Sequence, residues 1–309
     1  MSISTTPLFQ RLLARSPFSE HELVVLIATA PSRYKTHYID KRGGRGRREI
    51  SQPTKEIKFL QRILINHELK DLPVHEAAVG YRQGRSILDH AQPHASARYL
   101  LKLDFADFFP SLKRRALEYR LSQDTTYSET ERWMLGNLLC RNKKKSDTYQ
   151  LSIGAPSSPL VSNYLLYEFD TRMLLYCNTK AVRYTRYADD LALSTSVPSV
   201  LDDVKVEVCR LIQELEYLGL TLNEAKTVNV STKRRRTLVG LTLSNDGRAS
   251  IGREAKRELR LAIHRMCLGT LPPSEVAHLR GRLAFTYAIE PEFVIQLLSR
   301  YGFASIADI

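Results

Sequence analysis

Tyr187-Ala188-Asp189-Asp190 lies between two short segments that are rich in β-branched, aromatic and aliphatic residues, 181–186 and 191–195. Both segments show partial alternation of apolar and polar residues, which is typical of strands. Because Asp-Asp favours a turn, the sequence predicts a β-hairpin with two carboxylates at its tip. Adjacent like charges repel each other, so the tip needs water or a cation, and Mg²⁺ is commonly shared between carboxylates and substrate phosphates. A solvated turn is the alternative interpretation.

A third carboxylate, Asp104, ends another apolar segment far upstream. Residues 99–104 are mostly apolar and predict a buried strand. If this strand neighbours the hairpin in one sheet, Asp104 meets Asp189 and Asp190 at the sheet edge. Carboxylates gathered in this way can hold two magnesium ions about 4 Å apart, an arrangement that serves in-line phosphoryl transfer. The sequence offers no competing Ser–His, Cys–His or His-Glu-x-x-His centre.

The charge balance indicates a polyanionic partner. Lys and Arg number 46 against 33 Asp and Glu, a formal excess of 13. A chain this basic, with no apolar segment long enough to span a bilayer and no secretory signal, most often binds nucleic acid. A generic basic surface is the alternative. The four cysteines form no Cys-x-x-Cys pair, so neither a zinc site nor a disulfide framework is indicated. We therefore expect a reduced, cytoplasmic location and no membrane partner.

Apolar spacing along the rest of the chain predicts helices mixed with short strands, which is an α+β pattern. Helices are expected within 8–30 and over about 55–70, 110–120, 128–140, 159–175, 203–218 and 254–267. Short strands are expected at 220–223 and 227–230, with a further strand pair around the hairpin turn Asn245-Asp246-Gly247. Ser128 and Glu131 have the spacing of a capping box, which predicts where one of the helices begins.

Three basic segments are candidates for contact with a nucleic-acid backbone. Residues 41–48 combine Gly with Arg and precede a helix, which favours phosphate contact over a solvated turn. For the basic turn at 141–145 the two interpretations are equally good. The helix expected at 254–267 has an apolar face beside a basic one, so it is suited to pack on protein and lie along a backbone. The basic residues of that helix are Arg253, Lys256, Arg257, Arg260 and Arg265.

Four motifs follow one another along the chain: Leu103-Asp104-Phe105-Ala106-Asp107-Phe108-Phe109, Gly154-Ala155-Pro156-Ser157-Ser158-Pro159, Tyr187-Ala188-Asp189-Asp190 and 219–227. In this order and spacing, over about residues 45–300, the chain resembles the reverse transcriptases. The resemblance implies a right-hand polymerase with fingers, a palm built on an antiparallel sheet and a mostly helical thumb. The expected division is into N-terminal helices and fingers (1–98), palm (99–125), an insertion between fingers and palm (126–158), palm with the hairpin (159–235) and thumb (236–309).

The resemblance also implies a role for each residue of the site. Asp104, Asp189 and Asp190 would be the catalytic carboxylates, and with the carbonyl of Phe105 they would bind two Mg²⁺ ions. Phe109 falls where the family places an aromatic side chain that excludes a 2′-hydroxyl, and plain core packing is the alternative. The other expected nucleotide-binding residues are Arg48 at the triphosphate, Lys226 near the leaving pyrophosphate, Asp107, Gly154, Ala155 and Pro156.

More narrowly, residues 84–94, 238–241 and 251–254 resemble segments of bacterial retron reverse transcriptases. His90 stands where those enzymes usually carry Asn, Leu238-Val239 alters their Val-Thr-Gly motif, and Ile153 replaces a common Gln. The resemblance implies a partner RNA that is copied in part from a 2′-hydroxyl primer, a branched RNA–DNA product (msDNA), dNTP substrates and an effector protein acting against phage. The residues expected to bind RNA are His90, His94, Val239, Gly240, Arg253, Lys256, Arg257 and Arg260.

Two other functions are compatible with parts of the sequence. The first is another defence-associated or intron-type reverse transcriptase, which shares the four motifs. The second, from a different class, is a non-catalytic RNA-binding scaffold for an effector. The intact set of Asp104, Asp189 and Asp190 favours an enzyme, because a scaffold has no need of clustered negative charge beside a polyanion. A nuclease using the same metal chemistry is less well supported, since Phe109 and the ordered polymerase motifs do not serve cleavage.

Overall fold

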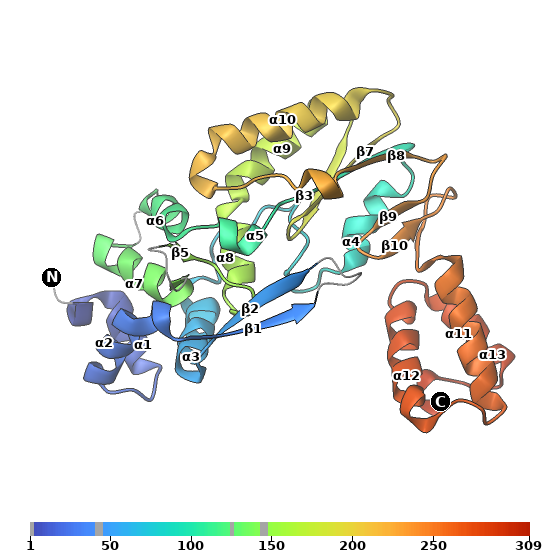
Figure 1. Cartoon of the computed structure of the whole chain (residues 1–309), viewed down its shortest axis with the longest axis horizontal. Coiled ribbons are helices and arrows are strands. Elements are labelled where there is room, and N and C mark those ends of the chain that lie inside the picture. Colours follow the sequence, from blue (N-terminus) through green and yellow to red (C-terminus); the bar gives the residue numbers. More distant parts are fainter. Residues whose placement is uncertain (1–2, 41–45, 124–126, 143–147) are drawn as a thin grey trace.

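A four-stranded antiparallel sheet lies at the centre of the molecule, with the strand order β6-β7-β3-β8. Its strands are β3 (Tyr99–Asp104), β6 (Arg183–Tyr187), β7 (Asp190–Thr195) and β8 (Val228–Ser231). Strands β6 and β7 form the predicted hairpin, and β7 pairs directly with β3. Both predictions, of the hairpin and of its neighbour strand, are therefore confirmed. Figure 1 shows α9 (Tyr167–Thr179) and α10 (Val200–Glu214) along one side of this sheet.

The computed structural model describes residues 3–40, 46–123, 127–142 and 148–309. The basic segments predicted at 41–48 and 141–145 fall partly outside these ranges. Of their described residues, Gly46 precedes a strand and the others are in strands: Arg47 and Arg48 belong to β2 (Arg47–Pro53), and Arg141–Asn142 forms β4, which pairs with β5 (Tyr149–Gln150). None of the helices in the described part of the chain combines the length and hydropathy that a bilayer crossing requires.

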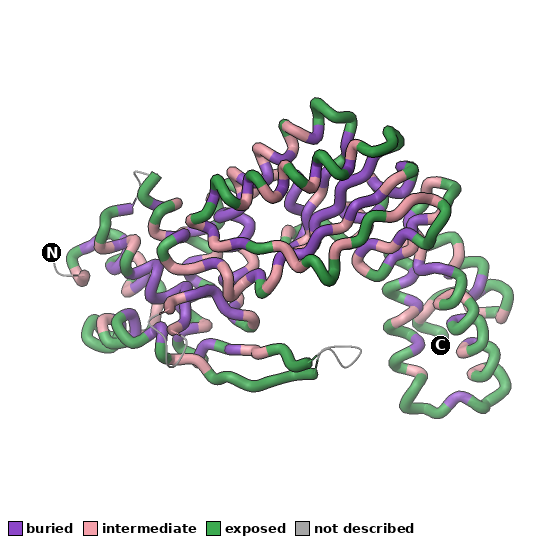
Figure 2. The backbone as a smooth tube through the Cα atoms, turned by 45° about the horizontal axis from the view of Figure 1, so that its top comes forward, coloured by how far each residue is buried: buried purple, intermediate pink, exposed green. Residues whose placement is uncertain are grey.

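The N-terminal part of the chain packs its helices around a common apolar core. These helices are α1 (Pro7–Ala14), α2 (Glu20–Thr29), α3 (Lys55–Ile63) and α7 (Glu129–Leu139). The predicted capping box is present at Ser128, whose side chain and backbone exchange hydrogen bonds with Glu131. From this core the antiparallel pair of β1 (Tyr34–Asp40) and β2 extends as a largely exposed ribbon (Figure 2).

Two of the predicted helices are each divided into two in the structure. The helix expected at 110–120 is two helices, α5 (Phe108–Ser111) and α6 (Arg114–Ser122). Between them Leu112 has an extended backbone, and its carbonyl accepts a hydrogen bond from the Leu151 N–H at 3.0 Å. The helix expected at 159–175 is likewise divided into α8 (Ser158–Leu165) and α9, and the helix expected at 203–218 ends early, at Glu214. The strand expected at 220–223 is wrong, because Leu222 alone forms a β-bridge, to Phe105.

The C-terminal part begins with a small sheet of β9 (Arg236–Leu238), β10 (Leu241–Leu243) and β11 (Ala249–Ser250). Three helices follow, which we call the C-terminal bundle: α11 (Gly252–Cys267), α12 (Pro273–Tyr287) and α13 (Pro291–Arg300). The bundle stands beside the central sheet in Figure 1. Leu259 and Ile263 of α11 are buried, as the amphipathic pattern predicts.

The two faces of the central sheet belong to two different cores. Leu101 and Leu103 of β3 lie in the core shared with the N-terminal helices, whereas Leu100 lies in a second core. Strand β7 divides its side chains in the same way, because Ala192 joins the second core. That second core also contains buried residues of α4 (Ile87–Ala91), of the small sheet and of the C-terminal bundle. The alternation of side chains along a strand accounts for this division.

Candidate active site

The register of β3 and β7 brings the predicted carboxylates to one edge of the sheet. Asp104 is the Cα partner of Asp190 at the ends of these two antiparallel strands. Next to this pair, the N–H of Phe105 donates a hydrogen bond to the Asp189 carbonyl at 3.1 Å. Asp104 is itself only 5% exposed. Residues far apart in sequence thus place three acidic side chains around the turn of the hairpin.

Burial and mutual repulsion raise the pKa values of the two hairpin carboxyls. The pKa of Asp190 is raised to about 6, first by burial and then by the negative charges of Asp189 and Asp104. The pKa of Asp189 is raised for the same reasons, with nearby Lys226 and Arg48 acting in the opposite direction. The local excess of negative charge is therefore large enough to favour a bound cation.

Lys226 contacts this cluster from the short 3-10 helix η6 (Glu224–Lys226), which comes at the end of the loop that follows α10. Its Nζ donates hydrogen bonds to both carboxylate oxygens of Asp104, each at 2.8 Å. Backbone contacts hold the loop in place: the Asn223 N–H donates to the Asp104 carbonyl at 2.8 Å, and the Ala106 N–H donates to the Thr221 carbonyl at 2.9 Å. The ammonium group is thereby fixed beside the carboxylates, and its expected contact with the pyrophosphate stays a prediction.

The donor chemistry of the cluster fits a divalent cation, since carboxylate and carbonyl oxygens are the ligands that Mg²⁺ prefers. The oxygens available are those of Asp104, Asp189 and Asp190 and the carbonyl of Phe105. In the described ranges, no three His, Cys, Asp or Glu side chains are already arranged as a metal site. Because Lys226 bonds both oxygens of Asp104, a cation bound there would share this carboxylate with the ammonium group or displace it.

An aromatic group lies at the same edge. Phe109, at the start of α5, is partly exposed, and its ring centroid lies 6.0 Å from that of Tyr81. The Tyr81 ring lies 6.3 Å from Tyr187 of the hairpin. Tyr81 has a φ of 63°, a left-handed conformation that is unfavourable for a bulky residue and is often found at functional sites. Sequence reasoning missed Tyr81, because the segment 74–100 shows no periodicity. Asp107 is exposed and begins α5 in a left-handed conformation.

The Gly154-Ala155-Pro156 turn packs against β2, the strand that carries Arg48. The Ser51 N–H donates to the Ile153 carbonyl at 2.8 Å. Gly154 has a φ of 114°, and a Cβ at this position would lie 3.0 Å from the Gln52 side chain, so only glycine fits well. Arg48 is exposed, and its charge acts on Asp189 and on Tyr81. The structure thus brings together the Gly154-Ala155-Pro156 turn and the strand of Arg48. The positive charge of Arg48 acts on the Asp189 carboxylate.

His90 and His94, predicted to bind RNA, are fully buried. The Thr185 hydroxyl lies between them, 2.7 Å from His90 Nδ1 and 2.8 Å from His94 Nε2, and the Ser194 hydroxyl lies 2.7 Å from His94 Nδ1. Burial is the main reason why the pKa of each histidine is lowered to about 3. Both imidazoles therefore support the central sheet from within and are not brought to the surface.

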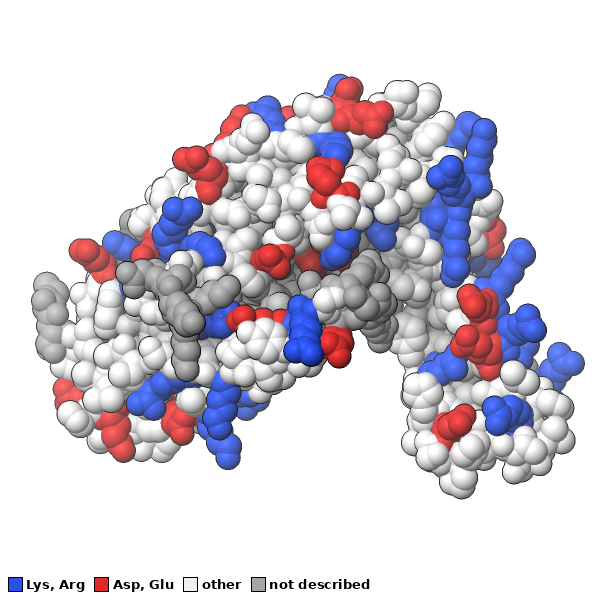
Figure 3. Space-filling view, in the orientation of Figure 1, with Lys and Arg blue, Asp and Glu red and all other residues white. Residues whose placement is uncertain are grey.

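The remaining residues predicted to bind RNA are near or in the C-terminal bundle. Arg253, Arg257 and Arg260 are exposed on α11, whereas Lys256 is bonded to Glu290 at 2.5 Å. Lys256 and Arg260 both lie over the ring of Phe293. Val239 and Gly240 form the turn between β9 and β10 with positive φ angles of 43° and 86°. Figure 3 shows Lys and Arg side chains gathered on the outer side of this region.

Comparisons with known proteins agree with this geometry. Residues 39–243 match the family model described as "Reverse transcriptase (RNA-dependent DNA polymerase)". The chain is 36% identical to the retron Ec83 reverse transcriptase of Escherichia coli over 92% of both chains. It is 32% identical to the retron Ec86 reverse transcriptase of the same organism over 92% of this chain and 87% of that one.

Similarity to solved structures supports the same fold. A telomerase from Candida tropicalis superposes with a TM-score of 0.50 at 14% sequence identity, covering 87% of this chain and 57% of the telomerase. The chain thus spans little more than half the length of that protein, and at this identity the likeness concerns the fold alone. From the family match and the retron relatives, the chain belongs to the reverse transcriptases, which are RNA-directed DNA polymerases, and within them to the bacterial retron enzymes.

Proposed function

We propose that this enzyme copies part of a dedicated structured RNA into DNA, starting from a 2′-hydroxyl of that RNA, and leaves a branched RNA–DNA molecule. The observation that carries the proposal is the 36% identity to a retron reverse transcriptase over 92% of both chains. An RNA template follows from the family. The structured RNA, the internal primer and an effector protein acting against phage with the enzyme are the proposed additions.

Reverse transcriptases generally depend on a divalent metal. We expect two Mg²⁺ ions, bound by Asp104, Asp189, Asp190 and the Phe105 carbonyl. The ions would lower the pKa of the attacking hydroxyl and offset charge on the transferred phosphoryl group. The protein's own contribution is to position these oxygens, and the sheet register supports that role by placing Asp104 opposite Asp190.

The residues around the carboxylates have the chemistry to hold a nucleoside triphosphate. Arg48 supplies a cation at the triphosphate, and the backbone of the Gly154-Ala155-Pro156 turn faces the same strand. Lys226 holds a proton at the position where charge develops on the leaving pyrophosphate. Phe109, with Tyr81 beside it, limits the space next to the sugar and would exclude a 2′-hydroxyl. Asp107 is exposed at the same edge.

The RNA would contact the basic surface of the C-terminal bundle and the turn before it. Arg253 and Arg257 are exposed and project from one side of α11, where they can follow a phosphate backbone. Lys256 and Arg260 are drawn toward Phe293, so their contribution would come through the packing of α11 on α13. Val239 and Gly240 would present backbone at a tight turn. His90 and His94 would act indirectly, through the sheet that they support.

The proposal is tested by expressing the protein with its native flanking DNA and extracting the nucleic acid bound to it. Digestion with RNase and DNase should reveal a short, discrete DNA joined to RNA. The Asp189→Ala, Asp190→Ala double variant should contain the RNA but not the DNA. Bound RNA without DNA in the wild-type sample would contradict the proposal and favour the scaffold function, and DNA without a covalent RNA link would contradict the 2′-hydroxyl primer.

A further inference from the structure

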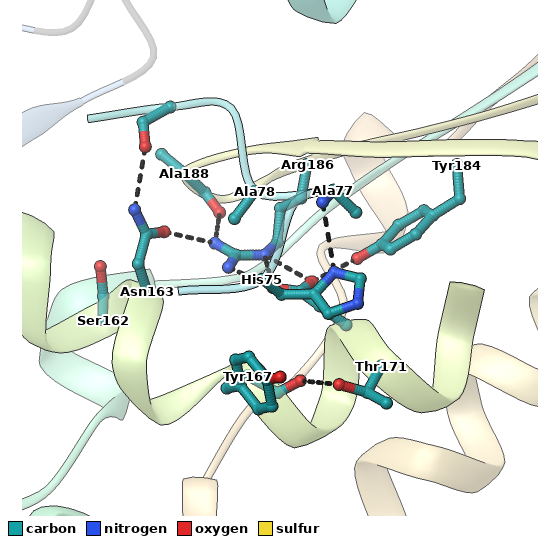
Figure 4. A network of polar contacts seen from close by, with 12 residues as sticks. His75, Ala77, Ala78, Ser162, Asn163, Tyr167, Thr171, Tyr184, Arg186 and Ala188 are labelled. Carbon is teal, nitrogen blue, oxygen red and sulfur yellow. Dashed lines mark hydrogen bonds and ion pairs between the residues drawn. The ribbon is translucent and has the colours of Figure 1, made fainter. Parts of the chain in front are cut away.

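A buried arginine lies directly behind the catalytic turn. Arg186 is the fourth residue of β6 and is fully buried, and in Figure 4 its guanidinium extends between Asn163 and the carbonyl of Ala188. The Nη1 group donates to the Ala188 carbonyl at 3.0 Å and to Asn163 Oδ1 at 3.2 Å. The Nε group donates to Asp170 Oδ1 at 2.8 Å, and Nη2 donates to Asp170 Oδ2 at 2.5 Å. One side chain thus joins a helix, a second helix and the turn.

The carbonyl that Arg186 holds belongs to the peptide immediately before Asp189. Ala188 has a φ of 59°, a left-handed conformation that is unfavourable for alanine and persists only where the surroundings impose it. On the other side of the turn, the Phe105 N–H holds the Asp189 carbonyl. The peptide planes before and after Asp189 are each fixed by one hydrogen bond, so the direction of the Asp189 side chain depends on both.

Asn163 connects the same arginine to a second segment. Its Oδ1 accepts from Arg186, and its Nδ2 donates to the Gly80 carbonyl at 2.9 Å. Gly80 touches the turn itself: a Cβ there would lie 2.8 Å from the Ala188 nitrogen. The segment before it runs parallel to β6, with the Val79 N–H donating to the Arg186 carbonyl at 2.8 Å. Residue 81, the strained tyrosine beside Phe109, follows directly.

We propose that Arg186 and Asn163 are positioning residues that fix the catalytic turn and tie it to the segment 77–81 on the nucleotide side. Only arginine provides the required geometry, because two nitrogens of its planar guanidinium bond the Asp170 carboxylate while the third bonds the Ala188 carbonyl of the turn. A lysine would retain the charge but meet at most some of these acceptors. The inference rests on the proposed catalytic role of Asp189, and its test must separate the two.

A matched control exists elsewhere in the chain. Asn137 is also buried and makes the same two kinds of contact: its Oδ1 accepts from Arg114 Nη1 at 2.6 Å, and its Nδ2 donates to the Ile27 carbonyl at 3.1 Å. It belongs to α7 and packs on α2, away from the carboxylates. Asn163→Ala and Asn137→Ala therefore remove equivalent bonds, one pair at the turn and one pair in the N-terminal core.

The experiment measures primer extension on poly(rA)·oligo(dT) with dTTP, together with titration of the active fraction and thermal unfolding. We expect Asn163→Ala and Arg186→Lys to lower kcat per active site by about tenfold or more, with KM for dTTP changed less than about threefold, because misplacement of a reacting group slows chemistry more than binding. Asn137→Ala should lower the unfolding temperature similarly and keep kcat per active site within about twofold of wild type. Asn163→Asp, which keeps the acceptor for Arg186 and loses the donor to Gly80, serves if Asn163→Ala does not fold.

The outcomes distinguish the positioning role of Arg186 and Asn163 from the proposed catalytic role of Asp189. If the Asn163 and Arg186 variants lose activity only in proportion to their active fraction, as Asn137→Ala does, their role is structural and the inference is wrong. Asp189→Asn is assayed in parallel and should be inactive. If Asp189→Asn is active, the proposed catalytic site is itself wrong. If Asp189→Asn is inactive while Arg186→Lys has the kcat of wild type, the proposed catalytic site is supported and the positioning role of Arg186 is wrong.

Discussion

Lys226 and Asp104 form a two-point contact in which one ammonium group bonds both oxygens of one carboxylate, at 2.8 Å each. The lysine ends a short 3-10 helix, η6 (Glu224–Lys226), and the aspartate ends a central strand, so the contact joins two of the motifs shared with the family. It also places a proton donor at the most buried of the three carboxylates. Its removal should therefore affect the reaction more than the fold.

Lys226→Ala is expected to lower kcat for nucleotide addition by about 10- to 100-fold, the range given by the loss of one charge-assisted hydrogen bond. Lys226→Arg should retain much of the activity, because the charge stays in place. Single-nucleotide addition under saturating dTTP measures both. Lys205, whose Nζ bonds Glu224 of the same 3-10 helix at 2.7 Å, provides the control, and Lys205→Ala should leave kcat unchanged. Equal rates for Lys226→Ala and wild type would exclude a role for the ammonium in catalysis.

Phe109→Ala should admit ribonucleotides. The side chain would no longer fill the space beside the sugar, so the preference for dTTP over UTP is expected to fall by about tenfold or more. Competition between the two nucleotides in primer extension gives the ratio directly. Phe108→Leu is the matched control, because Phe108 is buried in the neighbouring core and its change should lower stability without altering the ratio. A wild-type ratio in Phe109→Ala would leave Phe109 with a packing role alone.

Acid should destabilise the protein through its buried histidines. The pKa values of His90 and His94 are lowered to about 3, mainly by burial, and Lys102 and Arg183 add positive charge near them. In the unfolded chain histidine titrates near pH 6.5, so below this pH the unfolded state binds protons that the native state does not. The contribution of these two histidines to the free energy of unfolding is therefore fully present above about pH 6.5. It is lost as the pH falls toward 3, by up to about 1.4 kcal/mol per pH unit for each histidine.

His90→Asn tests this pH dependence, because it removes one of the two titrating groups. The free energy of unfolding in urea, measured from pH 7 to pH 5, should then change less steeply with pH than in wild type, whatever the absolute stability of the variant. His278→Asn, a change on the exposed face of α12, should leave the slope as it is. Parallel curves for His90→Asn and wild type would show that His90 takes no part in acid destabilisation.

Removal of two exposed arginines of α11, Arg253 and Arg257, should weaken RNA binding in a salt-dependent way. If Arg253 and Arg257 each contact a phosphate, the Arg253→Ala, Arg257→Ala variant should bind RNA less tightly and reduce the slope of log K against log [salt] by between about 1.4 and 1.8. Filter binding over a range of salt concentrations measures this. Arg210→Ala removes a charge from α10, where Arg210 is paired with Glu207 and Glu214, and should leave the slope unchanged. An unchanged slope in the double variant would show that Arg253 and Arg257 do not contact the phosphates of the RNA.

The carboxylates were predictable because Asp104 ends a strand with a clear pattern and Asp189 and Asp190 lie at the turn between two others, and the motif order supplied their neighbours. The burial of Arg186 was not predictable, because nothing in the sequence distinguishes a buried arginine from an exposed one until its acidic partner is known. That partner, Asp170, lies on a helix, and sequence periodicity does not reveal which polar residues meet across elements. The break at Leu112 was missed for a related reason: the Leu151 N–H that bonds its carbonyl comes from a distant segment. Tyr81 lies in a segment without periodicity, where conformation is set by contacts with the hairpin.

The division of β3 between two cores has a consequence for how the protein opens. Leu101 and Leu103 lie in the core that also holds α9, α10 and the N-terminal helices, and Leu100 lies in the core of the C-terminal side. Strands β3 and β7 are therefore shared by the two cores. If one core opens, the other still covers the opposite face of these strands. Amide protons of β3 and β7 should exchange with solvent only when both cores are lost. On this expectation Asp104 and Asp190 lie on the strands whose amides exchange last, so their register is kept until both cores are lost.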